Sequence, residues 1–334
     1  MNRFPLRALV AASIAALSLG SLAACGSSGS ADANAATTGD IKVAVFPSFS
    51  SLGAHEALAD GAFKAQGLNV SFVTVNTPAD VAPLLSSGQV QFGLMDMTTP
   101  VLAAAKASKA PFVFDAPATK GTPVDSDGWG TANVWVKKGS KITSIKDLQN
   151  AKFGIPQLNS QLWLDIRSNV DAAGGDSSRI QWVQIPDPAQ NVAEIKSGQI
   201  DATTSSEPTG AMLASDPGLT HLGGFVSNEG HLAYAYASTS DFASQNAALV
   251  KKFDAAIMKG NKDFNALATA AKAKLAAGVN SAWPAAALKK ARYSTFSTTP
   301  VTASDVQFSI DRMKKYQMLD SSSSLTADDL LPQS

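Results

Sequence analysis

Cysteine and histidine are scarce in this chain of 334 residues, which has one cysteine and three histidines. A single cysteine excludes an intrachain disulfide framework and any zinc or iron–sulfur site built from several cysteines. The histidines, His55, His221 and His231, do not have the spacing of metal ligands. The sequence therefore predicts no metal site and no cofactor.

An excess of charge of either sign is also lacking, because 27 Lys and Arg balance 27 Asp and Glu. This balance argues against a nucleic-acid-binding protein, which needs a clustered basic surface. The chain contains no G-x-S-x-G elbow, no P-loop and no G-x-G-x-x-G motif, and no nucleophile–base pair can be assembled from it. We therefore expect a protein that is not an enzyme.

The first 24 residues have the pattern of a lipoprotein signal peptide. Arg3 and Arg7 form a basic start, and an apolar run from Ala8 to Leu22 is too short for a stable transmembrane helix. The run ends in Leu22-Ala23-Ala24-Cys25, which resembles a bacterial lipobox. An ordinary secretory signal with a chance cysteine is the alternative.

Residues 25–39 are rich in Gly, Ser and Ala, which predicts a flexible tether. A lipid on Cys25 followed by a tether predicts a protein anchored at the extracytoplasmic face of the cell membrane. The apolar content of 45% supports a sizeable core in the remaining chain, whose length suggests about two domains.

Strands and helices are predicted to alternate from residue 41 onward. Strands are expected at 41–46, 69–75 and 90–94, with a helix whose inner face includes Leu58 and Phe63 and another that begins near Pro78. Strands separated by helices in this way indicate a parallel sheet with right-handed crossovers.

The same order returns 110 residues later. Ser87-Gly-Gln-Val90 reappears as Ser197-Gly-Gln-Ile200, between expected strands at 152–155, 180–185 and 200–203 and helices at 160–173 and from Pro188. The fold class is therefore predicted to be α/β, with two Rossmann-like lobes joined by two crossings. We assign residues 40–128 and 236–334 to the first lobe and residues 129–235 to the second.

Two lobes with two crossings leave a cleft, which is the usual place for a small ligand. In open α/β sheets ligands lie beyond the carboxyl ends of the strands, near helix N-termini. Polar and aromatic side chains in those loops are the candidate ligand-binding residues: Ser48, Phe49, Ser50, Ser51, Asp96, Thr98, Thr99, Trp129, Asn159, Ser160, Gln161 and Glu207. For each hydroxyl or amide, helix capping is the alternative role.

Arginine is rare near these loops. Of the six arginines in the sequence, Arg167 alone lies close to one of the loops, and it is expected two turns into a helix. Sulfonate and phosphate groups favour bidentate arginine, so the sequence predicts that neutral donors hold the polar group of the ligand.

Several short motifs together carry a family resemblance. Asp147-Leu148 precedes Lys152-Phe-Gly-Ile-Pro156, and Ser197-Gly-Gln-Ile-Asp-Ala202 precedes Glu207-Pro208; Ser87–Gly93 and Tyr236–Phe242 complete the series. Over about residues 40–319 the chain resembles the solute-binding proteins of ABC importers, and within them the aliphatic sulfonate, taurine, nitrate and thiamine-precursor group. The resemblance implies the type II periplasmic binding protein fold, hinge closure, a monomer, and a permease with its ATPase as partners.

Three positions depart from the pattern of that group. Ala151 stands where glycine is usual, Gln157–Ser160 where a Gly-Ser/Thr turn is frequent, and Ser206 where tryptophan commonly precedes the Glu-Pro pair. We therefore keep two ligand classes: a small organic or oxyanionic solute such as an aliphatic sulfonate or nitrate, and a thiamine precursor or other aromatic heterocycle. A lipid-anchored enzyme on the same fold and a chaperone-like lipoprotein with an exposed apolar surface remain as alternatives.

Overall fold

The structure, a computed structural model, describes residues 40–76, 78–228 and 230–332. These residues fall within one compact unit of the chain. The predicted leader at 1–24, the predicted lipidation site Cys25 and the tether at 25–39 lie outside them. None of the helices in the described part combines the length and apolar character needed to cross a membrane.

The first sheet has five strands, and the three predicted ones are parallel, as expected. β1 pairs in parallel with both β2 and β3, whereas β11 runs antiparallel to β3 and β4. The order across the sheet is β2 (Asn69–Thr74), β1 (Asp40–Val45), β3 (Phe92–Asp96), β11 (Tyr234–Thr239) and β4 (Phe112–Pro117).

The second sheet repeats this arrangement. β7 pairs in parallel with β8 and β9, and β6 runs antiparallel to β9 and β10. The order is β8 (Gln181–Gln184), β7 (Lys152–Ile155), β9 (Ala202–Ser206), β6 (Ala132–Lys137) and β10 (Leu219–Phe225). The predicted α/β class with two similar sheets is thus confirmed.

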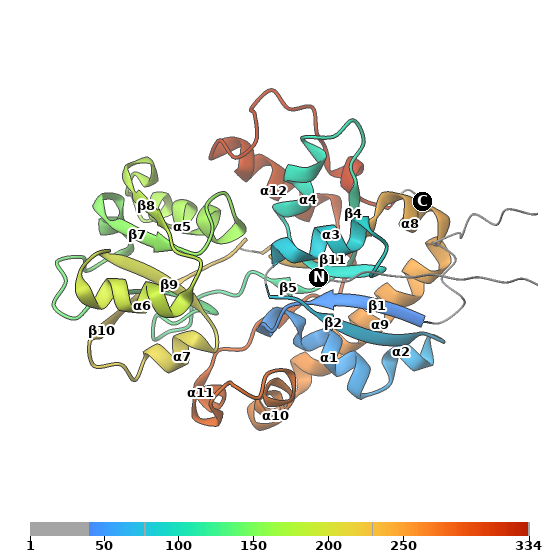
Figure 1. The fold of residues 1–334 in the computed structure, drawn as a ribbon, viewed down its shortest axis with the longest axis horizontal. Coiled ribbons are helices and arrows are strands. Elements are labelled where there is room, and N and C mark those ends of the chain that lie inside the picture. The colour runs from blue at the N-terminus through green and yellow to red at the C-terminus, as the bar shows by residue number, and fades with distance from the viewer. Residues whose placement is uncertain (1–39, 77, 229, 333–334) are drawn as a thin grey trace, which may run out of the picture. The chain divides into compact units, whose positions relative to one another are not determined.

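Helices cover both faces of the first sheet (Figure 1). One apolar cluster joins the sheet to α1 and α9, and another joins it to α3, α4 and α12. The elements are η1 (Phe49–Ser51), α1 (Leu52–Ala59), α2 (Ala62–Ala65), η2 (Pro78–Asp80), α3 (Val81–Ser86), α4 (Thr99–Ala104), α8 (Ser240–Gln245), α9 (Ala247–Ala266), α12 (Ala303–Lys315) and η5 (Ala327–Leu330).

The predicted inner face of the first helix was wrong at Leu58, whose side chain is 39% exposed. The single expected helix is divided into α1 and α2 by Gly61, which has a left-handed φ of 82°. That backbone conformation is accessible to glycine at little cost. The break shifts the buried face of α1 to Leu52, Ala54 and Ala57.

The second sheet is also covered on both faces, by shorter elements. These are η3 (Ile145–Asn150), α5 (Gln161–Ala172), η4 (Ser177–Arg179), α6 (Pro188–Ser197) and α7 (Thr209–Leu213). α5 begins where the Ser160 hydroxyl accepts the Trp163 backbone N–H, and it buries Ile166 and Val170 as predicted.

The two crossings, residues 118–131 and the described residues of 226–233, lie side by side. The Gly121 N–H donates to the His231 carbonyl at 3.0 Å, and Lys120 forms a bridge with Leu232. A Cβ at Gly121 would lie 2.1 Å from the Ser227 carbonyl oxygen, so only glycine permits this approach. The short strand β5 (Thr119–Lys120) also pairs with β12 (Thr295–Phe296).

The lobes also touch on both flanks of the crossings. On one flank α5 meets α12, and Leu164 joins the core of the first lobe. On the other flank α11 (Ala285–Lys290) contacts α7 and packs on α10 (Thr269–Val279), and Ala211 lies in one cluster with Phe264 and Leu288. The residue boundaries that we assign to the lobes remain a prediction.

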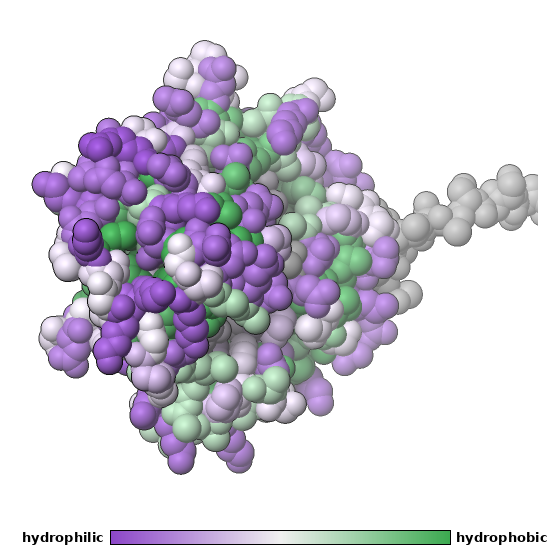
Figure 2. Space-filling view, turned by 60° about the vertical axis from the view of Figure 1, so that its left-hand side comes forward, coloured by the Kyte–Doolittle hydropathy of each residue, from purple (hydrophilic) through white to green (hydrophobic). Residues whose placement is uncertain are grey.

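The face of the molecule that Figure 2 shows is mainly polar. Figure 2 shows hydrophilic side chains over most of the face that comes forward, with paler and apolar residues towards the bottom, where α10 and α11 lie in Figure 1. Among the described residues, the large apolar side chains that are exposed are Leu58 and Met212.

Candidate functional site

A cavity of about 230 Å³ lies where the two lobes and both crossings meet. We call it the central cavity. It is lined by residues of both sheets and of the segments between them: Phe46, Ser48, Phe49, Ser50, Thr119, Lys120, Gly121, Thr122, Thr131, Ala132, Gln161, Leu162, Asp165, Ser206, Glu207, Phe225, Ser227, Ala233, Tyr234 and Ser294. Ligand pockets for drug-sized molecules usually measure about 300–1,000 Å³, so this cavity suits a small solute.

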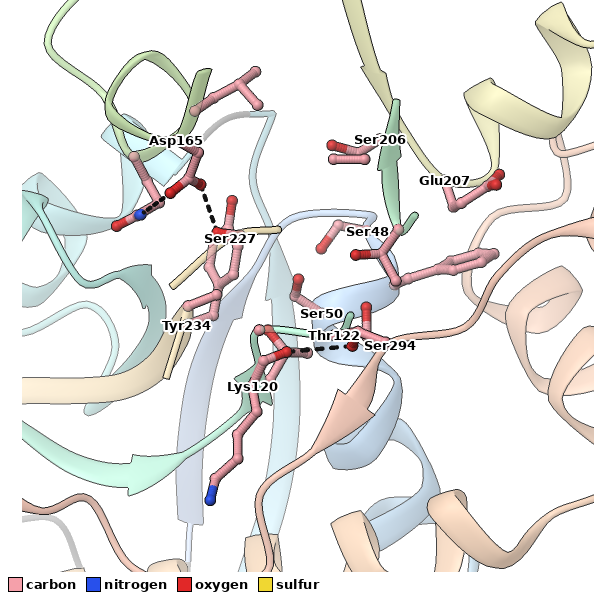
Figure 3. A pocket seen from close by; sticks show the side chains of 18 of the residues that line it. Ser48, Ser50, Lys120, Thr122, Asp165, Ser206, Glu207, Ser227, Tyr234 and Ser294 are labelled. Atoms are coloured by element: carbon pink, nitrogen blue, oxygen red, sulfur yellow. Dashed lines mark hydrogen bonds between the residues drawn. The ribbon is translucent and has the colours of Figure 1, made fainter. Parts of the chain in front are cut away.

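Hydroxyl groups from separate segments surround the central cavity (Figure 3). Ser48 and Ser50 follow β1, Ser206 ends β9, and Ser227 lies on the second crossing. Ser48, Ser50 and Ser206 follow the rule that the carboxyl ends of parallel strands and the loops after them form the binding crevice, because β1 and β9 both belong to the parallel part of their sheets. The first turn of α5 adds Gln161 to the wall.

Three buried polar atoms of this wall have no hydrogen-bond partner among the described residues. They are Ser48 Oγ, Gln161 Oε1 and Glu207 Oε1. Ser48 precedes η1 but does not cap it with its side chain. Because buried polar groups are normally hydrogen-bonded, atoms of this kind in a cavity wall are the natural contacts for a ligand.

Glu207 is held in place from one side. Its Oε2 accepts the Ala211 backbone N–H at 3.0 Å, and only 5% of the residue is exposed. Burial raises the pKa of Glu207, while the Ala211 N–H and Arg292 oppose the rise. Oε1 lies against α7, where a Cβ at Gly210 would be 3.4 Å from it, and the Arg292 backbone N–H also interacts with the carboxyl group. The carboxyl group therefore has a reduced tendency to ionise and is turned towards α7.

Asp165 forms the centre of a buried network behind the cavity. Its Oδ1 accepts from Arg312 at 2.9 Å and from Gln161 at 2.8 Å, and its Oδ2 accepts from Ser227 at 2.5 Å. Arg312 also donates to Asn228. Burial raises the pKa of Asp165, and the Arg312 guanidinium and the two neutral donors oppose that rise. The network joins α5 of the second lobe to α12 of the first.

A second cavity, of about 320 Å³, adjoins the first. We call it the side cavity. It shares Gln161, Leu162 and Tyr234 with the central cavity. Its other lining residues are Ala79, Asp96, Thr99, Leu102, Pro156, Gln157, Asn159 and Ser160.

The predicted site residues are divided between the two cavities. Ser48, Phe49, Ser50, Gln161 and Glu207 line the central cavity; Asp96, Thr99, Asn159, Ser160 and again Gln161 line the side cavity. Ser51, Thr98 and Trp129 line neither. Whether any of them binds a ligand stays a prediction.

Several predicted residues make contacts within the fold. Asp96 Oδ1 accepts from the Thr98 N–H and hydroxyl at 3.0 Å and from the Thr99 N–H at 2.7 Å. These bonds fix the backbone at the start of α4. The Ser51 hydroxyl donates to the Ser48 carbonyl at 2.9 Å. The Ser160 hydroxyl caps α5. The capping alternative therefore describes the contacts of Ser160 and Asp96, which accept backbone N–H groups at helix starts, whereas the side chain of Ser51 caps no helix.

The aromatic candidates stack on other rings. Phe49 stacks on Tyr293 with centroids 4.6 Å apart and also lines the central cavity. Trp129 stacks on His221 at 3.6 Å, under the Arg292 guanidinium at 4.8 Å. Burial lowers the pKa of His221 to about 4, so the imidazole in this stack is uncharged at neutral pH.

Sequence reasoning missed the residues that the crossings and the C-terminal segment contribute. Asp165, Ser227, Tyr234 and Ser294 line the central cavity, although none follows the carboxyl end of a predicted strand of its lobe. Their role depends on contacts between distant segments. Asp165 carried one local signal, since it lies four residues after Gln161 and therefore on the same side of a helix.

Metal ligation has no support in the described residues, which contain no group of three or more His, Cys, Asp or Glu side chains placed to hold an ion. The arrangement can bind a small polar molecule through hydroxyl, amide and carboxyl groups.

Solved structures with similar folds include periplasmic binding proteins. The aliphatic sulphonate-binding protein SsuA of Escherichia coli matches with a TM-score of 0.68 and 16% identity, covering 88% of this chain and 92% of its own. The nitrate-binding protein NrtA of Synechocystis PCC 6803 matches with a TM-score of 0.65 and 13% identity, covering 86% and 84%. A Candida albicans protein described as having the generic periplasmic binding protein fold matches at 0.67 and 17%, covering 87% and 94%.

These neighbours confirm the predicted periplasmic binding protein fold. No curated protein sequence matches the chain. A family model described as NMT1/THI5 like matches residues 49–267, which is more than half of the sequence and includes both crossings. The chain therefore belongs to the NMT1/THI5-like family.

Proposed function

We propose that this protein is the solute-binding component of an ABC importer, which captures a small molecule between its lobes without altering it. The observation that carries the proposal is the central cavity, because both lobes and both crossings line one space. The names of the neighbours, sulphonate-binding and nitrate-binding proteins, support the same function. A permease and its ATPase are the partners that such a protein serves.

Hinge closure is the mechanism that we propose for capture. The crossings are the segments about which the lobes can rotate, and contacts from both lobes to one ligand stabilise the closed state. Ser48 comes from the first lobe and Glu207 from the second, so a ligand that touches both favours closure.

Binding is expected to stabilise and compact the protein. A ligand at a hundredfold excess over its Kd adds about 2.7 kcal/mol to the free energy of unfolding. Thermal unfolding with sulfonates, nitrate, thiamine-precursor pyrimidines and amidines, followed by solution scattering, measures both effects. Ser50→Trp, which places a bulky ring in the cavity, should abolish them, whereas Ser322→Trp on the exposed surface should not. Tight binding without a smaller radius of gyration would argue against hinge closure.

A lipid anchor at Cys25 is the second part of the proposal, and it rests on the lipobox-like Leu22-Ala23-Ala24-Cys25. Cys25→Ala is expected to move the protein expressed in its native host from the detergent phase to the aqueous phase of a detergent partition. Ser27→Ala is the matched control and should remain with the detergent. Identical partition of the Cys25 variant and the wild type would contradict the anchor.

Absence of chemistry on the ligand can be measured directly. A bound solute that is recovered unchanged by mass spectrometry after long incubation supports a binding protein, whereas a modified product would favour the alternative of a lipid-anchored enzyme on the same fold.

A further inference from the structure

A short segment between α11 and β12, residues 291–294, passes beside the central cavity. We call it the Arg292 segment. Ser294 lines the cavity, and Figure 3 shows it beside Thr122. Tyr293 stacks on Phe49, another lining residue, with ring centroids 4.6 Å apart. The Arg292 segment therefore belongs to the cavity wall, although it is distant in sequence from the strand ends that form the rest of it.

The Arg292 segment is fixed to the first lobe. The Tyr293 hydroxyl donates to the Leu288 carbonyl at 2.9 Å, and Ala291 is buried in one cluster with Phe49 and Phe264. The strand β12, which follows directly, pairs with β5. The backbone that carries Arg292 is therefore held by α11 and by the aromatic cluster of the first lobe.

The turn that Arg292 contacts is fixed to the second lobe. This turn runs from Asp125 to Trp129 in the first crossing, and Asp125 Oδ1 accepts the Trp129 N–H at 2.8 Å. Trp129 stacks on His221 of β10 with ring centroids 3.6 Å apart. The Gly224 N–H, also on β10, donates to the Gly128 carbonyl at 2.7 Å. The turn is therefore expected to move with β10.

Arg292 links these two parts of the molecule. Its Nε lies 3.1 Å from Asp125 Oδ2, and its guanidinium carbon lies 4.8 Å from the centroid of the Trp129 ring. A planar guanidinium can pair with a carboxylate and stack on an indole at the same time. The Arg292 backbone N–H also interacts with the Glu207 carboxyl group, and α11 contacts α7. The lobes thus have a third, non-covalent link in addition to the two crossings.

The two flanks of the crossings differ in how firmly they hold the lobes together. On the α5–α12 flank the side chains of Arg312 and Asp165 are 11% and 2% exposed, and Leu164 lies in the core of the first lobe. On the α7–α11 flank the side chains of Arg292 and Asp125 are 33% and 38% exposed. Solvent weakens such a pair, and its separation leaves no buried charge without a partner. The α7–α11 flank is therefore the easier one to separate.

We propose that the central cavity opens at the α7–α11 flank and that Arg292 is the latch that holds this flank closed. The α5–α12 flank stays together while the lobes rotate about the crossings. A solute then enters and leaves beside the Arg292 segment, and closure brings Ser294 back to the cavity wall. The inference rests on the proposed function, because it describes how the same cavity opens, but its test needs no solute.

Distances between spin labels across each flank test the proposal in the free protein. Cys25 is the one cysteine of the chain, so Cys25→Ala gives a background without a native label site. Ser215→Cys with Ala277→Cys places two labels at exposed positions on either side of the α7–α11 flank. Ala172→Cys with Ser304→Cys does the same for the α5–α12 flank. Pulsed electron resonance measures the distribution of each distance.

Arg292→Met should lower the ratio of closed to open molecules by about 3- to 10-fold, because it removes an ion pair and a cation–π contact at a partly exposed site. The distance across the α7–α11 flank should lengthen, and the distance across the α5–α12 flank should not change. Arg292→Lys should give an intermediate ratio, since an ammonium group keeps the charge without the planar stack. Lys289→Met removes the same charge from an exposed position on α11 and should match the wild type.

The outcomes separate this inference from the function on which it rests. A folded Arg292→Met variant whose distance across the α7–α11 flank equals that of the wild type would overturn the role of Arg292 as a latch. Equal lengthening across both flanks would overturn the assignment of the opening to the α7–α11 flank. Both results would keep the solute-binding function, which the thermal screen tests. Failure of every solute in that screen, with opening observed at the α7–α11 flank, would contradict the function and support the latch.

Discussion

Replacing Arg312 with methionine is expected to lower the free energy of unfolding by about 3–5 kcal/mol. The Arg312 guanidinium and the Asp165 carboxylate are 11% and 2% exposed, and Nη2 lies 2.9 Å from Oδ1. Removal of the arginine leaves a buried carboxylate whose remaining donors are the neutral Gln161 and Ser227. Urea denaturation of the variant and the wild type measures the difference.

Two further variants distinguish the effect of an unpaired buried charge on stability from the effect of losing an arginine side chain. Arg179→Met removes an exposed arginine and should change stability by no more than about 0.5 kcal/mol. Arg312→Met combined with Asp165→Asn should recover part of the loss, because no unpaired charge is then buried. A loss below about 1 kcal/mol in Arg312→Met alone would mean that the pair does not hold α5 to α12.

The same network sets the orientation of a cavity residue. Asp165 accepts a hydrogen bond from Gln161 Nε2, which fixes the side-chain amide of a residue that lines the cavity. Loss of Arg312 should therefore weaken ligand binding as well as stability. The same hydrogen-bond network therefore both holds the lobes together and positions a residue of the binding site.

The repeated architecture could be predicted because its signal is local. Gly88 and Gly198 adopt φ values of 71° and 81° at equivalent turns, and both turns have the Ser-Gly-Gln sequence. The structure adds paired contacts at the same spacing: Lys42 N–H donates to Gln91 at 2.9 Å, and Lys152 N–H donates to Asp201 at 2.8 Å. Turn chemistry and strand patterning are properties of neighbouring residues, so they can be read along the chain.

The central cavity could be predicted only in part, because its wall depends on contacts that are distant in sequence. Ser48 and Glu207 were found from the rule on strand ends. Asp165 and Arg312 are 147 positions apart in the chain, and no local sequence pattern predicts that they form a pair. Capping and binding also use the same residue types, so Ser160 and Asp96 could not be distinguished from Ser48 before their hydrogen bonds were known.

Asp115 is expected to make the stability of the first lobe fall as the pH rises. It lies on β4 at an irregularity where Ala116 pairs with Tyr236 and Phe114 with Ala237, so Asp115 has no partner across the strands. The residue is 7% exposed, and neither carboxylate oxygen has a well-formed hydrogen bond in the described fold. Bulges of this kind turn an extra side chain toward the interior.

The sign follows from proton binding. Burial raises the pKa of Asp115 from the usual 3.8 to about 8, with Ser238 opposing the rise and Asp254 adding to it. Between these two values the folded protein holds a proton that the unfolded chain has lost. The stabilisation is therefore complete below about pH 4 and is lost as the pH rises through about 8, at up to about 1.4 kcal/mol for each pH unit.

Asp115→Asn should remove this dependence, because an amide keeps the shape of the protonated acid and cannot ionise. Urea denaturation between about pH 5 and pH 8 should give a steeper fall for the wild type than for the variant, and the variant should be the more stable at the upper end. Asp241→Asn, at a 75% exposed carboxylate paired with Lys109, is the control and should keep the wild-type slope. Equal slopes for Asp115→Asn and the wild type would mean that the pKa of Asp115 in the folded protein is close to its usual value. The irregularity in β4 would then admit enough water to solvate the charge.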